Sequence, residues 1–66
     1  MNPSDEARKL LDLEAELERG FPQLPVDKVH AVVENAWMRY LHAPVREFVP
    51  LLVGREARGQ LRVLSP

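Results

Sequence analysis

PVDKVHAVVENAWMRYLH, at residues 25–42, is the stretch that decides the fold. Its apolar residues recur every three or four positions, which is the spacing that gives an α-helix one apolar face. Pro25 favours a helix start, because a first-turn N–H has no partner within the helix and its loss costs little. The stretch therefore predicts a central helix. Its expected core face consists of Val26, Val29, Val33, Ala36, Trp37 and Tyr40.

Upstream, residues 3–19 predict a first helix that begins with Asn2 as N-cap and Pro3 in the first turn. We expect it to stop at a left-handed Gly20. Glu14 falls within the apolar arc of this helix, where an unpaired carboxylate is costly, so it should meet a basic partner or lie at an opening. The apolar arc comprises Ala7, Leu10, Leu11, Leu13, Leu17 and Phe21.

Downstream, a third helix is predicted over residues 44–61, with Pro44 in its first turn and a frayed tail over 62–66. Pro50 then falls in the helix interior, where it predicts either a kink or a first turn that is offset from the rest of the helix. Gly54 and Gly59 should weaken this helix by about 1 kcal/mol each relative to Ala, unless a neighbour packs closely on them. One face is expected to carry Val45, Phe48, Val49 and Leu52, and its flank Leu51, Arg55 and Arg58.

Short turns between these segments favour antiparallel neighbours, so the chain is predicted to be one all-α domain over 1–66, an up-down-up three-helix bundle. A helical hairpin with a detached first helix is the alternative. The charges favour the bundle: residues 1–19 carry six acids and three bases, whereas residues 44–66 carry four Arg and two Glu. An acidic first helix and a basic last helix complement each other when they pack side by side.

Composition narrows the function classes. The chain is 45% apolar and 29% charged with a net charge of −1, which is an ordinary globular balance and argues against sequence-independent nucleic-acid binding. No apolar run is long enough to span a bilayer, and no secretory signal is visible, so the cytoplasm is the expected compartment.

Residues suited to catalysis are few. There is no Cys, and the two histidines, His30 and His42, lack carboxylates at metal-ligand spacing, so neither a metal nor another cofactor is expected. His30 and Glu34 lie one helical turn apart and offer a base with an orienting acid, but a surface pair is far commoner at this spacing. We therefore expect that the chain is not an enzyme.

The basic residues of the third segment suggest a second function class. Arg55, Arg58 and Arg62 follow a short turn, as in a DNA-reading helix-turn-helix, so a small regulatory DNA-binding domain is the alternative function. Pro50, two glycines and the neighbouring glutamates make such a recognition helix unfavourable. The simpler expectation is that Arg55 and Arg58 pair with first-helix acids such as Glu14 and Glu18.

Residues 29–61, VHAVVENAWMRYLHAPVREFVPLLVGREARGQL, resemble a small three-helix-bundle domain common in actinobacterial proteins. That domain occurs alone or N-terminal to enzymes that resemble low-molecular-weight protein-tyrosine phosphatases and arsenate reductases. The resemblance implies the three-helix fold but no activity, because those enzymes use a Cys-containing phosphate loop and this chain has no Cys. Gly54 departs from the pattern, which has a larger residue there. The matching positions are Val45, Arg46, Phe48, Pro50, Leu52, Arg55, Ala57, Arg58 and Leu61.

The leading hypothesis is a non-catalytic helical protein-interaction module. It either self-associates or docks onto a phosphatase-like or arsenate-reductase-like enzyme domain. The candidate interaction surface consists of Leu10, Glu14, Leu17, Leu51, Arg55 and Arg58.

Overall fold

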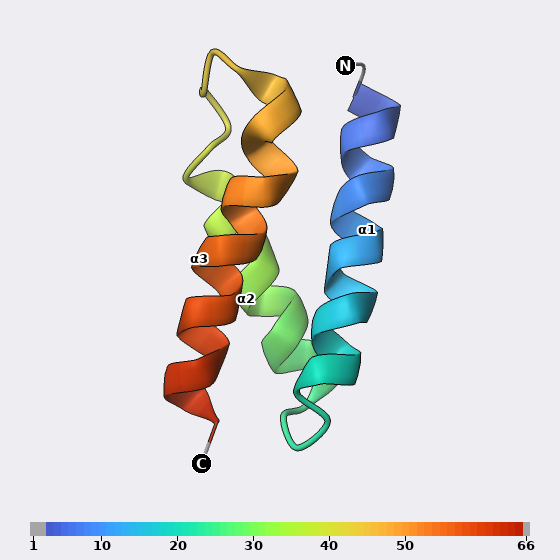
Figure 1. Cartoon of the computed structure of the whole chain (residues 1–66), viewed down its shortest axis with the longest axis vertical. Coiled ribbons are helices and arrows are strands. Elements are labelled where there is room, and N and C mark those ends of the chain that lie inside the picture. The colour runs from blue at the N-terminus through green and yellow to red at the C-terminus, as the bar shows by residue number, and fades with distance from the viewer. Residues whose placement is uncertain (1–2, 66) are drawn as a thin grey trace.

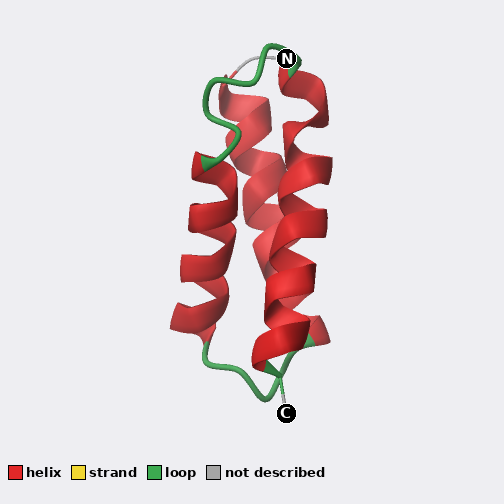
Figure 2. Ribbon diagram, turned by 90° about the vertical axis from the view of Figure 1, so that its left-hand side faces the viewer, coloured by secondary structure: helices red, strands yellow, loops and turns green. Residues whose placement is uncertain are grey.

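The computed structural model describes residues 3–65, which form three α-helices and one short 3-10 helix. Their bounds are α1 Pro3–Gly20, α2 Val26–Met38, η1 Arg46–Phe48 and α3 Val49–Leu64. Successive α-helices alternate in direction, with α2 packed behind α1 and α3 (Figure 1), and the two long connections lie at opposite ends of the bundle (Figure 2). The predicted all-α three-helix bundle is confirmed.

One hydrophobic core joins the three helices. Because α1 packs against both α2 and α3, the alternative with a detached first helix is wrong. Some residues predicted to face the core do not: Leu11 is 66% exposed, Val26 58% and Phe48 54%. The core residues recur every three or four positions along α2 and every four along α3, as helices buried on one side require. They are Leu17, Val29, Val32, Val33, Ala36, Val49, Val53, Ala57 and Leu61.

The central helix is shorter than predicted, because it ends at Met38 instead of continuing to residue 42. Residues 39–43 form tighter turns, in which the Tyr40 N–H donates to the Trp37 carbonyl. The Tyr40 carbonyl accepts hydrogen bonds from the Ala43 N–H and the Arg46 guanidinium, and the Leu41 carbonyl accepts one from the same guanidinium. A side chain from beyond the turn therefore takes the place of further helical hydrogen bonds.

The third helix starts at Val49 and not at residue 44, and a separate 3-10 turn, Arg46–Phe48, precedes it, so the offset first turn expected at Pro50 is present. Pro50 lies in the first turn of α3, where its missing N–H removes no helical hydrogen bond. Shifting the start also selects a different buried face. Val49, Val53 and Ala57 face the core, whereas Val45 and Phe48 precede the helix and are exposed.

The ends of the helices differ in detail from the sequence predictions. Gly20 is the last residue of α1, but no glycine within residues 3–65 has a positive φ, so the predicted left-handed stop is wrong. Pro22 supplies the stop, since it disfavours helical geometry at the residue before it. α3 extends to Leu64, beyond the predicted end at residue 61. Asn2, the predicted N-cap, and the last residue of the 62–66 tail lie outside the described residues.

Candidate interaction groove

A groove with a volume of about 790 Å³ runs between α1 and α2. Two hydrogen bonds fix the register between α1 and α2. One runs from Trp37 to Glu6 and the other joins His30 and Glu14. The half of the groove nearest the start of α1 is mainly apolar, and the other half carries the carboxylates of Glu14 and Glu34. The apolar lining consists of Ala7, Leu10, Leu11, Val33, Trp37 and Leu41.

A buried carboxylate closes the apolar half of the groove. Glu6 is only 7% exposed, and its Oε1 accepts one hydrogen bond from Trp37 Nε1 at 2.8 Å and another from Arg46 Nη2 at 2.5 Å. These partners, Trp37 first, hold the pKa of Glu6 below its ordinary value although burial alone would raise it. Arg46 also binds the backbone beyond α2, so this cluster joins α1, the end of α2 and η1.

The polar half of the groove is built around His30 of α2. Its Nδ1 lies 2.5 Å from Glu14 Oε1 of α1, and its Nε2 lies 3.2 Å from Glu34 Oε2. The hydrogen bond with Glu14 is the main reason that the pKa of His30 is raised above 6.5, and the charges of Glu14, Glu34 and Asp27 act in the same direction. The basic partner expected for Glu14 is therefore a histidine on α2, and Glu14 also borders the opening.

The two carboxylates lie on either side of the His30 ring. Its Nδ1 is hydrogen-bonded to Glu14, and its Nε2 is within ion-pair distance of Glu34. Within residues 3–65, no group of three or more His, Cys, Asp or Glu side chains is arranged to hold a metal ion. The cluster therefore joins two helices and places negative charge at the groove.

A second exposed surface follows the outer side of α3. Phe48 and Leu51, which is 65% exposed, precede the exposed Arg55 and Arg62, all within one helical stripe. We call these four residues the α3 outer face. Gly59 lies on the same side, with no neighbouring atom within 4 Å of the position that a Cβ would take.

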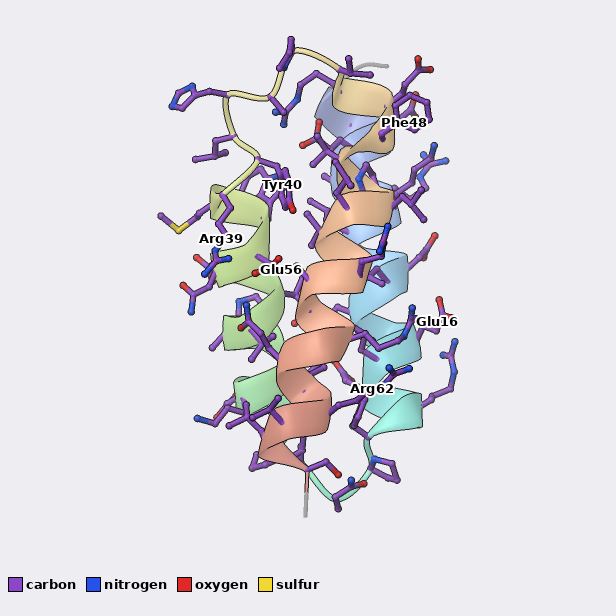
Figure 3. All side chains as sticks on the ribbon, turned by 60° about the vertical axis from the view of Figure 1, so that its left-hand side comes forward. Glu16, Arg39, Tyr40, Phe48, Glu56 and Arg62 are labelled. Carbon is purple, nitrogen blue, oxygen red and sulfur yellow. The ribbon has the colours of Figure 1, made fainter. Side chains whose placement is uncertain are left out.

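Salt bridges connect α3 to α1 on one side and to α2 on the other. Arg58 lies beside α1, with its Nη2 3.7 Å from Glu16 Oε1, so it pairs with an acid of the first helix as expected, although with neither Glu14 nor Glu18. On the other side of α3, Glu56 pairs with Arg39 of α2, and Figure 3 shows these two side chains meeting between the helices. Phe48, labelled in the same view, directly precedes the first residue of α3, and its side chain lies away from the core.

The residues predicted to form one interaction surface are distributed over four places. Leu10 and Glu14 line the groove, whereas Leu51 and Arg55 are exposed on α3. Arg58 is half-buried beside Glu16. Leu17 is 1% exposed, so it belongs to the core and to no exposed surface, because its position on α1 faces both other helices.

Sequence reasoning missed the Glu6–Trp37–Arg46 cluster. The sequence predictions assign Glu6 no role in the core, yet Glu6 precedes Leu10 by four residues and so shares the buried stripe of Leu17. That spacing was the available signal. Trp37 was expected in the core. It packs against the core but also lines the groove and donates to Glu6.

Searches among protein-family models, curated proteins and solved structures found no match to this chain. Among the described residues, no helix has both the length and the apolar character needed to cross a membrane.

Proposed function

We propose that this chain is a non-catalytic helical interaction module that self-associates, with the α3 outer face of one copy seated in the α1–α2 groove of the next. The observation that carries the proposal is that both surfaces change from apolar to charged within one helical turn, and that their charges are opposite. A helix lying in an apolar groove is a common mode of recognition.

The spacing of the two surfaces supports this fit. In the groove, Leu11 of α1 is followed three residues later by Glu14, and on the α3 outer face Leu51 is followed four residues later by Arg55. Either interval is about one helical turn, or about 5.4 Å along the axis. A docked α3 that runs parallel to α1 would therefore bring its apolar turn beside Leu11 and its Arg55 beside Glu14.

Charge supports the same orientation. The polar half of the groove holds Glu14 and Glu34 around a single histidine, whereas the α3 outer face presents Arg55 and Arg62. Opposite potentials across an interface guide encounter and set the register. The contact joins two different surfaces of the same chain, so it is head-to-tail.

The DNA-binding alternative has less support from α3. Arg58 is paired with Glu16, and Glu56 and Glu47 add negative charge on and beside the helix. Phosphate binding depends on several unpaired cations, and its affinity falls steeply with salt. A mobility shift with duplex DNA at low salt separates the two functions, because the self-association proposal predicts no shifted band.

Sedimentation equilibrium over micromolar to millimolar concentrations tests the proposal. The test uses Leu11→Glu in the groove and Leu51→Glu on the α3 outer face, two leucines so exposed that their replacement should leave the monomer folded. We expect each variant to remain monomeric. Their equimolar mixture should form a 1:1 dimer, because each variant keeps the surface that the other has lost. Met38→Glu is the matched control, since Met38 is 55% exposed but does not line the groove.

Two outcomes would overturn the proposal. One is a wild-type chain that stays monomeric at millimolar concentration. The other is a mixture of the Leu11 and Leu51 variants that fails to form the dimer while wild type associates, since this would place the contact elsewhere.

A further inference from the structure

The polar half of the α1–α2 groove contains a histidine between two carboxylates. The imidazole of His30 lies between Glu14 Oε1, 2.5 Å from Nδ1, and Glu34 Oε2, 3.2 Å from Nε2. When His30 is doubly protonated, its Nδ1–H donates a hydrogen bond to Glu14, and its positive charge lies within ion-pair distance of Glu34. The two acids that would receive an incoming arginine are then already paired.

We propose that His30 competes with the docking arginine of a second copy for Glu14 and Glu34, so that self-association strengthens as His30 loses its proton. This inference rests on the proposed self-association and adds the regulation of the same groove. It follows from the position of His30, because its imidazole already occupies Glu14 Oε1, an oxygen that an incoming arginine would bind.

The charge of the cluster gives the direction of the effect. With His30 protonated, the two carboxylates and the imidazolium sum to −1. With His30 neutral they sum to −2, and Asp27 of α2 adds further negative charge nearby. An arginine stays protonated at every relevant pH, so its attraction to the groove increases when the histidine becomes neutral.

The burial of the three side chains makes the exchange feasible. The Glu14 side chain is only 14% exposed, whereas those of His30 and Glu34 are 61% and 56% exposed. The imidazole can therefore turn into solvent without disturbing the core, leaving Glu14 to an incoming guanidinium. A planar guanidinium binds a carboxylate through two hydrogen bonds, which an imidazole cannot match.

The pKa of His30 sets the pH at which the change should occur. In the isolated chain the contact with Glu14 raises this pKa above 6.5. Association removes that contact, so the pKa of His30 should fall towards its ordinary value and a proton is released. By linkage, affinity then increases with pH, about tenfold for each unit by which association lowers the pKa.

The test measures the dissociation constant by sedimentation equilibrium from about pH 5.5 to about pH 9, the range in which a histidine titrates. We expect the wild-type constant to fall by about threefold or more as pH rises. His30→Gln should associate with no such dependence. His42→Gln, which changes an exposed histidine beyond the end of α2, should behave like wild type.

A second readout follows His30 itself. The pKa of its ring, measured by NMR, should be higher in the monomeric Leu51→Glu variant than in associated wild type. A wild type that associates equally at all these pH values, or a His30→Gln variant that keeps the dependence, would overturn the competition and leave the self-association proposal standing. A chain that is monomeric at every pH would overturn both.

Discussion

Leu13 of α1 lies against Gly54 of α3 so closely that a Cβ at position 54 would stand 3.2 Å from Leu13 Cδ1. Gly54 is buried in the middle of α3, where glycine by itself costs helix stability. Its position is therefore explained by packing, since it is where α1 and α3 come close together. Gly59 has no such neighbour.

The two glycines should respond differently to the same substitution. Gly59→Ala is expected to stabilise the monomer by about 0.5–1 kcal/mol through helix propensity. Gly54→Ala should increase the free energy of unfolding by less than Gly59→Ala does, because the Leu13 side chain must move. Gly54→Leu should destabilise the chain by about 1–3 kcal/mol by overpacking. Urea unfolding at low protein concentration measures all three. Equal gains for the two alanine variants would contradict the close contact.

Trp37 should contribute to stability through its hydrogen bond as well as through packing. Trp37→Phe keeps an aromatic ring but removes the N–H that Glu6 accepts, and we expect a loss of about 1–2 kcal/mol. Tyr40→Phe is the control, because it deletes a hydroxyl outside this cluster and should change stability by less than about 0.5 kcal/mol. Thermal and urea unfolding would show the difference, and similar losses for both variants would argue against the Glu6 bond.

Acid should destabilise the fold through Glu6. Because its pKa in the folded chain lies below the ordinary 4.5, Glu6 contributes stability above that value and loses it as pH falls through the folded pKa. Glu6→Gln should be less stable than wild type at neutral pH, and the gap should narrow in acid. Unfolding free energies of both proteins from about pH 7 to about pH 2.5 provide the measurement. A gap that stays constant would show that the charge of Glu6 is unimportant.

The contribution of His30 to stability depends on pH in the opposite direction from that of Glu6. Its pKa is raised in the folded chain, so its contribution is complete below the ordinary 6.5 and is lost as pH rises through the folded pKa. The monomer should therefore be slightly less stable under mildly alkaline conditions, and His30→Gln should remove the decrease. Chemical unfolding well below the association range tests this, with His42→Gln as reference. A decrease that survives in His30→Gln must come from another group.

Much of the fold was predictable from spacing alone. The recurrence of Val29, Val33 and Ala36 identified the central helix, and Gly20 located the end of the first helix, although not its left-handed geometry. The boundaries between residues 38 and 49 were not predictable from local signals. Arg46 caps backbone carbonyls five and six residues upstream and reaches Glu6 forty residues away. Helix propensities carry no information about a contact of that kind.

The candidate site was only partly predictable for the same reason. Glu14 was correctly identified as needing a partner, because a carboxylate within an apolar arc needs one on energetic grounds. That the partner is His30 depends on the register between α1 and α2, which no single helix encodes. Leu17 was placed on the surface because a helical wheel separates apolar from polar faces but does not say which apolar residues remain exposed.

The Arg46 cluster has a consequence for how the chain unfolds. Arg46 joins α1 to the connection between α2 and α3, so detaching α1 removes the acceptor that fixes this connection as well as one wall of the core. Opening at either end of the sequence should then spread to the other. The bundle is expected to exchange its most protected amide hydrogens in a single cooperative event, with no long-lived two-helix remnant.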